Sequence, residues 1–350
     1  MKKTSCKTKI SPRAIKKIEL STIDEYINWD KIRELMYPNK NHCGRKKVFT
    51  YDKMLKVCKL QDILGIIHDT AMAKIVRENE TFQRFCNFKY GQTPSHDVIS
   101  RFKREISFET LGKVFEYIDI ELANLNFFEN DQLCIDGTDL RLSHKSKIAT
   151  WGAKSNRKKF CGLWLLTLNS TNREVIRDFV IDTAKVGQIK LFYRLIRKLK
   201  NKTVENSDYM IADGIFDNEK SYRLIKKTLK MTPIIPYNPR KSKTKLREQL
   251  DKSNWRFKYI KNTKKEEKFQ EIYKSRTAVE RENSRIKTLS LIKDIEYLSK
   301  TNPKVSSKWL VTQIILSLIS INMSTLAQHA YNIENPLPIQ TTITDFYAIA

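Results

Sequence analysis

Cysteine and histidine are scarce in this chain, and neither is grouped in a way that predicts a site. Six cysteines lie scattered in the first half of the 350 residues, with no Cys-x-x-Cys pair among them. This spacing argues against a disulfide framework and against a structural zinc site. The five histidines show no grouping typical of a catalytic triad. An enzyme that attacks through serine, cysteine or histidine is therefore not expected.

Long apolar segments are also rare. The first twenty residues carry seven lysines and arginines and no apolar core. They do not form a secretory signal, and we expect the chain in the cytoplasm, associated with the nucleoid. One uncharged run, residues 309–328, approaches the length of a membrane span. Its many serine, threonine, asparagine and glutamine side chains favour a buried core helix, so no membrane partner is expected.

Acidic side chains are too few to balance the basic ones. Lysine and arginine number 66 against 39 aspartates and glutamates, which gives a formal net charge of +27 and a pI near 9.7. Solubility alone does not require so large a charge. The excess favours a polyanion partner over a generally basic protein without one. Nucleic acid comes first, because neutralised phosphates supply most of the non-specific affinity for DNA.

The first third of the chain has the apolar spacing of helices. Residues 20–125 place apolar side chains three and four positions apart, so we expect a helical N-terminal DNA-binding region over 1–128. Within it, residues 93–106 begin with helix-start chemistry and are expected to expose Arg101, Lys103 and Arg104. This segment is either the second helix of a helix-turn-helix that enters a DNA groove or an ordinary basic amphipathic helix.

Strand-like and helix-like segments alternate after residue 131. Three β-rich runs are expected to form sequential antiparallel strands, and two helical runs lead into two further strands. Such alternation predicts an α/β sheet with parallel crossovers. A long helical pattern over about 271–298 follows. We expect the first part of the core at 129–236, a basic insertion at 237–270, the C-terminal helices of the core at 271–330 and a tail at 331–350.

The insertion is polar and strongly basic. Residues 237–268 hold twelve basic and four acidic side chains, yet Trp255, Phe257 and Tyr259 alternate as in a strand. Aromatic rings among cations suit nucleic acid, where bases stack and cations meet phosphates. A hairpin whose rings simply cover the main domain explains the pattern equally well, so both interpretations stay open.

Two aspartates occupy equivalent places in the strand-like runs. Asp136 follows the apolar run 133–135, Asp213 follows the run 210–212, and each is followed by glycine. In open α/β sheets ligands gather where strands end, and a carboxylate on such a rigid element can hold a metal ion. Asp-Gly is also ordinary turn chemistry, so neither aspartate alone identifies a site.

A third carboxylate lies on an unusual helix face. Tyr273, Arg276, Glu280 and Lys287 stand at offsets of 0, 3, 7 and 14 residues. At about 100° per residue, the four side chains fall on one stripe about 60° wide. The alternative is an ordinary surface ladder with an Arg276–Glu280 ion pair. Two aspartates and a glutamate are oxygen ligands that suit magnesium, and two such ions can promote an in-line phosphoryl displacement.

These residues resemble a known family. The spacing Tyr-x2-Arg-x3-Glu-x6-Lys over residues 273–287 is similar to the YREK signature of bacterial and archaeal insertion-sequence transposases with a DDE triad. The segments 135–138 and 212–217 resemble the two aspartate motifs of that family, although Ile215 replaces its usual glycine or alanine. Residues 79–106 also resemble the N-terminal region of the family, so the likeness covers most of the chain.

The resemblance implies an RNase H-like α/β fold, in which a mixed sheet is flanked by helices and carries a helical N-terminal domain and a small basic insertion. It implies that two magnesium ions, or manganese as a substitute, are bound by Asp136, Asp213 and Glu280. It also implies contacts with element-end DNA from Tyr273, Arg276 and Lys287.

The expected activity is metal-dependent cleavage at the ends of a mobile element, followed by attack of the freed 3′-hydroxyl on target DNA. The expected partners are element-end and target DNA, with a homodimer assembled on DNA. One alternative is a non-catalytic protein that keeps only sequence-specific DNA binding. The other is a structure-selective nuclease on the same fold.

Overall fold

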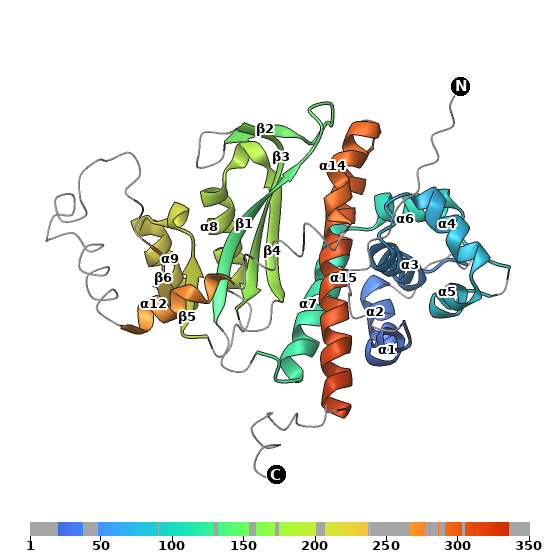
Figure 1. Cartoon of the computed structure of the whole chain (residues 1–350), viewed down its shortest axis with the longest axis horizontal. Coiled ribbons are helices and arrows are strands. Elements are labelled where there is room, and N and C mark those ends of the chain that lie inside the picture. Colours follow the sequence, from blue (N-terminus) through green and yellow to red (C-terminus); the bar gives the residue numbers. More distant parts are fainter. Residues whose placement is uncertain are drawn as a thin grey trace, which may run out of the picture.

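A computed structural model of the whole chain describes residues 20–37, 48–89, 91–128, 132–153, 159–171, 175–200, 207–236, 238, 267–277, 280, 286, 291–302 and 305–335. A long helix, α15 (Ser307–Glu334), runs through the middle of the molecule in Figure 1. The helices α1 to α6 gather on one side of α15, whereas α7 and the sheet lie on the other.

The N-terminal part of the described chain is helical, as predicted. Its helices are α1 (Leu20–Tyr26), α2 (Trp29–Met36), α3 (Tyr51–Leu64), α4 (Asp69–Glu78), α5 (Glu80–Phe85), α6 (His96–Glu105) and α7 (Phe108–Asn124). Local chemistry sets several ends. The side chains of Asn28, Asn79 and Ser107 cap α2, α5 and α7 by accepting from backbone amides at 3.0, 3.1 and 3.0 Å. Gly65 ends α3 in the left-handed conformation that glycine adopts without strain.

The strands of the described chain form one mixed sheet. They are β1 (Leu133–Arg141), β2 (Thr150–Ala153), β3 (Lys159–Ser170), β4 (Ile176–Thr183), β5 (Tyr209–Ala212) and β6 (Thr232–Ile234). β3 pairs antiparallel with both β1 and β4, whereas β5 and β6 run parallel to β1. The helices α8 (Gln188–Leu199) and α9 (Glu219–Leu229) make the crossovers that parallel pairing requires. The predicted mixed α/β sheet is confirmed.

One strand was absent from the sequence-based prediction. β2 pairs with the beginning of β3, Thr150 opposite Gly162, and its four residues are too few for a visible alternation. Gly162 is required there, because a Cβ at this position would lie 2.0 Å from the carbonyl oxygen of Leu140.

The two faces of the sheet pack against different helices. Ile135 and Leu166 belong to the cluster that joins the sheet to α8 and α9. Leu140 and Leu163 belong to a larger core on the opposite face, with α14 (Ile292–Thr301) and α15. Because side chains alternate along a strand, Asp136 lies on the same face as Leu140.

The helix α15 is the centre of the larger core. It contacts α1, α3, α6 and α7, so the N-terminal helices and one face of the sheet share a single cluster of buried residues. By length and composition α15 could cross a membrane, but 83% of its most apolar window is buried inside the protein. The ammonium of Lys59 donates to the carbonyl oxygen of Ser320 at 2.6 Å inside this core. A buried core helix was predicted for this segment.

The helical pattern predicted over 271–298 is helical but not continuous in the described residues. α12 (Glu267–Lys274) and α14 are separate helices, with turns at Ser275 and Leu291, whereas residues 276, 277, 280 and 286 are helical. The hydroxyl of Ser275 donates to the carbonyl oxygen of Ile272 at 2.6 Å. The amide of Leu291 donates to the carboxylate of Asp62 at 3.2 Å. Apolar spacing does not reveal these breaks. The basic insertion lies outside the described residues, apart from Asn238 and the first residues of α12.

The helix α6 forms where it was predicted, but one of its expected surface cations is buried. Lys103 is 0% exposed, and its ammonium lies 2.7 Å from Asp69 and 4.7 Å from the ring centre of Trp309. Arg101 and Arg104 are exposed. Lys103 was assigned to the surface because charge usually marks it, whereas here a paired carboxylate and an indole ring satisfy the buried cation. The role of α6 in a DNA groove stays a prediction.

Candidate active site

The two predicted aspartates are carried by neighbouring parallel strands. Ile135 of β1 pairs with Ala212 of β5, so the next residues, Asp136 and Asp213, stand side by side at a strand spacing of about 4.8 Å. Asp136 was expected at the end of its strand. It lies inside the strand instead, because β1 continues to Arg141. β5 ends at Ala212, so the edge of β1 beyond Asp136 is no longer paired by β5. This step in the sheet leaves room for a ligand beside both carboxylates.

The loop after β5 holds Asp213 in place. The amide of Gly214 donates to the Asp213 carboxylate at 2.5 Å. Asp217 is fully buried and accepts from the Tyr222 hydroxyl at 3.1 Å and from the backbone amide of Asn238 at 2.7 Å. Asp217 belongs to the second aspartate motif, but no role was predicted for it. The sequence feature that could have indicated its importance is the position of a second acidic residue four places after Asp213.

Arg276 connects the helical segment to Asp213. Its Nη1 donates to the hydroxyl oxygen of Tyr273 at 2.8 Å and lies 3.6 Å from Oδ1 of Asp213. Its Nη2 lies 3.7 Å from Oε1 of Glu280. The structure thus brings together five of the six predicted site residues, Asp136, Asp213, Tyr273, Arg276 and Glu280. Lys287 lies outside the described residues.

A small apolar cluster seats α12 on the sheet. Ile272 packs with Cys134 of β1 and Ile211 of β5, and Tyr273 lies against the same cluster. The hydroxyl of Ser275 also donates to the side chain of Gln132, just before β1, at 3.3 Å. The strand residues that precede the two aspartates therefore also position the helix that brings Arg276 to them.

The carboxylates shift the pKa values of the groups around them. Burial lowers the pKa of Arg276. The charge of Asp213 outweighs this and, with smaller effects of Tyr273 and Asp136, raises the pKa well above its usual value. Burial, reinforced by the charge of Asp136, raises the pKa of the Cys134 thiol. The arginine is therefore always charged, and Cys134 stays a protonated thiol that is unsuited to attack a substrate.

The donor set fits a divalent cation. Asp136, Asp213 and Glu280 carry three negative charges against the single charge of Arg276, so two remain, and hard oxygen ligands suit magnesium. Arg276 lies between the carboxylates of Asp213 and Glu280 as a counter-cation. Within the described part of the chain no three His, Cys, Asp or Glu residues are already close enough to hold a metal. For Asp213 and Glu280 to share an ion with Asp136, the carboxylates would have to lie closer together than they do here.

Comparison with known families accounts for both parts of the chain. Residues 128–300 match the family described as the transposase DDE domain, and residues 9–105 match a second family, described as transposase domain DUF772. The chain belongs to the DDE transposases. The DDE match spans β1 to α14, so it contains all three carboxylates, and the mixed sheet with its N-terminal helices is the RNase H-like transposase fold that the sequence predicted.

No curated protein matches this DDE transposase. Among solved structures it is similar to a piggyBac transposase synaptic complex with hairpin DNA, studied by cryo-EM. The TM-score is 0.34 and the identity 10%, over 92% of this chain and 83% of that chain. The family assignment rests on the two domain matches.

Proposed function

We propose that this DDE transposase cleaves DNA at the ends of its mobile element and joins the freed 3′-hydroxyl to target DNA. One observation carries the proposal. Arg276 contacts both Asp213 and Glu280, and Asp136 lies on the strand next to Asp213, so all three carboxylates lie near one guanidinium at the edge of β1. That arrangement suits phosphoryl transfer, in which positioning and charge neutralisation do most of the catalytic work.

Each residue has a distinct role in this proposal. Asp136, Asp213 and Glu280 hold magnesium, or manganese as a substitute. Two bound ions supply activation of the attacking oxygen and neutralisation of the leaving oxygen. The guanidinium of Arg276 binds a DNA phosphate with paired hydrogen bonds. Tyr273, which accepts a hydrogen bond from Arg276 at 2.8 Å, keeps it oriented, and Lys287 makes a further phosphate contact.

The proposed partners are element-end DNA and target DNA. The net charge of +27 supports binding to both through their phosphates. Joining two ends in one reaction requires two active sites, so we propose a homodimer assembled on DNA. The enzyme would act in the cytoplasm, at the nucleoid.

The decisive experiment compares the wild-type protein with Glu280→Gln on labelled DNA that carries the ends flanking its gene. With magnesium, the wild type should nick at the element end. Glu280→Gln should bind the same DNA but not cut it, because the amide is a poor ligand for a divalent cation.

Glu271→Gln is the matched control, because Glu271 is an exposed glutamate of α12 nine residues before Glu280. It should cut like the wild type. End binding without cleavage by any of the three proteins, in magnesium or manganese, would favour the alternative of a non-catalytic DNA-binding protein. Cleavage without joining to target DNA would indicate a nuclease.

A further inference from the structure

A second region of the chain has the composition of a DNA-binding surface. Residues 140–173 contain eight lysines and arginines and no aspartate or glutamate. The stretch covers the end of β1, the loop that follows, β2 and β3. Neither the carboxylates nor the YREK segment belongs to it.

One tryptophan in this stretch is exposed, on a strand that is firmly held. Trp151 of β2 is 63% exposed, whereas Trp29, Trp164 and Trp309 are at most 8% exposed. The amide of Lys185 donates to the hydroxyl of Thr150 at 2.9 Å, which fixes β2 against the segment after β4. The exposed indole is therefore presented by rigid backbone and has no apolar partner that explains its position.

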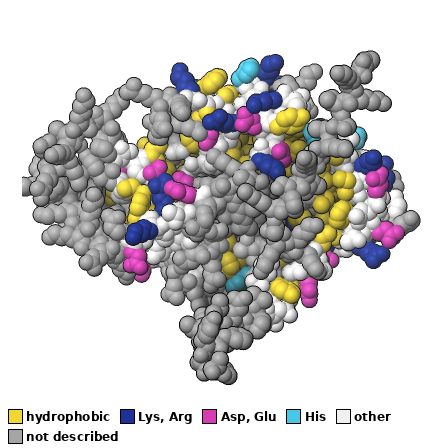
Figure 2. Space-filling view, viewed as in Figure 1, with side chains coloured by type: hydrophobic (Ala, Val, Ile, Leu, Met, Phe, Trp, Pro, Cys, Tyr) yellow, Lys and Arg dark blue, Asp and Glu magenta, His cyan; other side chains and the backbone are white. Residues whose placement is uncertain are grey.

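Exposed lysines lie near Trp151 in the loop before β2 and at the start of the neighbouring strand β3. We use the name β2 surface for Trp151 with the exposed lysines Lys145, Lys147 and Lys159. None of the three lysines forms an ion pair with an acid in the described part of the chain. Figure 2 shows dark-blue and yellow side chains gathered along the upper edge of the view, where β2 lies in Figure 1. An aromatic ring among unpaired cations suits a nucleic acid.

The β2 surface lies on the same face of the sheet as the catalytic carboxylates. Leu142 donates its amide to the carbonyl oxygen of Cys161 at 3.0 Å, and Cys161 pairs with Trp151. These three residues form one row across the sheet, on the face of Leu140 and Asp136. Leu142 lies six residues along β1 from Asp136, and Trp151 lies two strands across the sheet from Leu142. These two displacements place Trp151 roughly 22 Å from Asp136. That distance corresponds to about six or seven nucleotides of one DNA strand.

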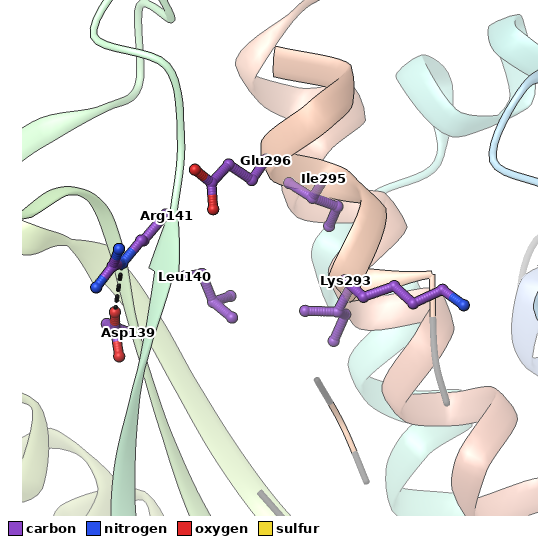
Figure 3. Close-up of a pocket in the computed structure, with 7 residues that line it drawn as sticks. Asp139, Leu140, Arg141, Lys293, Ile295 and Glu296 are labelled. Carbon is purple, nitrogen blue, oxygen red and sulfur yellow. Dashed lines mark hydrogen bonds and ion pairs between the residues drawn. The ribbon is translucent and has the colours of Figure 1, made fainter. Parts of the chain in front are cut away.

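The path between the two places is hollow. A cavity of about 400 Å³ lies between β1 and α14, lined by Leu140, Ile292, Ile295 and neighbouring residues. Figure 3 shows Leu140 pointing toward α14, while Asp139 and Arg141 pair with each other beside the strand, at 3.3 Å. The other acidic residue that lines this cavity, Glu296, is paired with Lys300 at 2.8 Å. No unpaired acid of the cavity therefore repels a backbone phosphate.

We propose that the β2 surface binds DNA about six or seven nucleotides from the phosphate that is cleaved. The lysines contact backbone phosphates, and Trp151 packs against a base or sugar. This inference rests on the proposed function, because it places that DNA relative to the carboxylates that cut it.

The test measures binding rather than cleavage. The probe is a duplex of about 40 base pairs that spans the junction between element end and flanking DNA, and every variant carries Glu280→Gln so that the probe stays intact. The logarithm of the binding constant falls by about 0.9 per phosphate contact for each tenfold rise in salt. Lys145→Gln with Lys147→Gln should therefore lower the salt slope by about two. The matched pair Lys227→Gln with Lys230→Gln, at the end of α9 behind the opposite face, should leave it unchanged.

Trp151→Ala should weaken binding about tenfold with the salt slope unchanged, because stacking does not release counterions. Trp151→Phe, which keeps an aromatic ring, should recover most of the loss. Iodinated bases placed along the probe should cross-link to the Trp151 peptide with greatest yield about six or seven nucleotides from the cleavage point. Wild-type affinity and slope in all β2-surface variants, or a cross-link maximum elsewhere, would overturn the inference.

The outcomes separate this inference from the proposed function. Probe binding that depends on Trp151 and the lysines, without cutting by the protein that keeps Glu280, supports the β2 surface and contradicts the catalytic proposal. If the protein that keeps Glu280 cuts the probe but the β2-surface variants bind like the wild type, the catalytic proposal is supported and the β2 surface is contradicted. Absence of any binding to the probe overturns both.

Discussion

The two halves of the candidate active site are held in place by different means. Asp136 and Asp213 follow Ile135 and Ala212, paired strand residues that are fully buried. Glu280 has a side chain that is 59% exposed, and an ion pair to Arg276 at 3.7 Å connects it to the rest of the site. The strand half is thus fixed by the packing of the sheet. In the helix half, the apolar cluster around Ile272 seats α12 on the sheet, but Glu280 itself is held by electrostatics.

This difference indicates how the site could change state. Because the Glu280 side chain is open to water, its ion pair with Arg276 stabilises the structure by only about 0–1 kcal/mol, so a cation or a DNA phosphate can draw Glu280 from Arg276 at little cost. Asp136 and Asp213 directly follow paired residues of β1 and β5, so their backbones stay close together. We therefore expect the helix half to move toward the strand half when metal and DNA bind.

The largest effect should come from the strand half. Asp136→Asn keeps the size of the side chain and removes its charge, so cleavage of end DNA should fall by about a thousandfold or more. Thermal unfolding should change little, because the amide fits the same place. Asp97→Asn, at an exposed position of α6, serves as the control in the same assays. Cleavage that survives in Asp136→Asn would remove this aspartate from the catalytic set.

The second effect tests whether Arg276 competes with a cation. Arg276→Gln removes a positive charge 3.6 Å from Asp213, so manganese binding without DNA, followed by electron paramagnetic resonance, should tighten about tenfold. Binding of end DNA by the same variant should weaken, since a phosphate contact is lost. Arg223→Gln, on the exposed side of α9, should change neither. Unchanged or weaker manganese binding in Arg276→Gln would mean that the helix half is not held by charge.

The third effect concerns the rigidity of the strand half. A Cβ on Gly137 would lie 2.8 Å from the side-chain amide of Gln188 and 3.2 Å from Leu166. Gly137→Ala should therefore lower the free energy of unfolding by about 1–3 kcal/mol, measured by urea denaturation, and Gln188→Ala should restore part of the loss.

Gly112 provides the matched control, because it lies inside α7 with nothing within 4 Å of an added Cβ. Gly112→Ala should stabilise the protein by up to about 1 kcal/mol. A Gly137→Ala variant as stable as wild type would show that the strand beside Asp136 is softer than its packing indicates.

The smallest effect concerns the chain beyond Glu280. Asp62 accepts a hydrogen bond from Leu291, just before α14, and burial raises its pKa. The native state then binds this proton more tightly than the unfolded state, so ionisation of Asp62 lowers stability as pH rises from the unfolded pKa through the raised folded pKa. Asp62→Asn should remove that decline. The free energy of unfolding of variant and wild type is measured by urea denaturation at a series of pH values from acid to neutral. If the two proteins show the same dependence on pH, this prediction is contradicted.

Sequence alone located the strand half more completely than the helix half. An apolar run before each aspartate predicts that the residue follows a buried strand. The structure bears this out for Asp213, whereas β1 continues from Asp136 to Arg141. The spacing of Tyr273, Arg276 and Glu280 identified residues that do meet. It could not show the turn at Ser275 or the contact between Arg276 and Asp213, because both depend on residues distant in sequence.

Other features were hidden for similar reasons. Lys103 is a charged residue on an amphipathic helix, and only its three-dimensional partners show that it is buried. β2 is four residues long, so its alternation cannot be told from chance, and the exposure of Trp151 depends on what packs against that strand. Charge and periodicity report local preference, whereas these features depend on which distant segments come together.

The central position of α15 has a consequence for how the protein is made. The hydroxyl of Tyr26 donates to the carboxylate of Glu334 at 2.5 Å, across 308 residues of sequence. The N-terminal helices therefore leave the ribosome long before the helix that completes their core. At about 5–20 residues per second, the ribosome needs roughly 10–40 seconds to go from α7 to α15. A gene copy truncated ahead of α15 would lose the packing of both ends of the protein, so simple truncation could not leave a stable DNA-binding half.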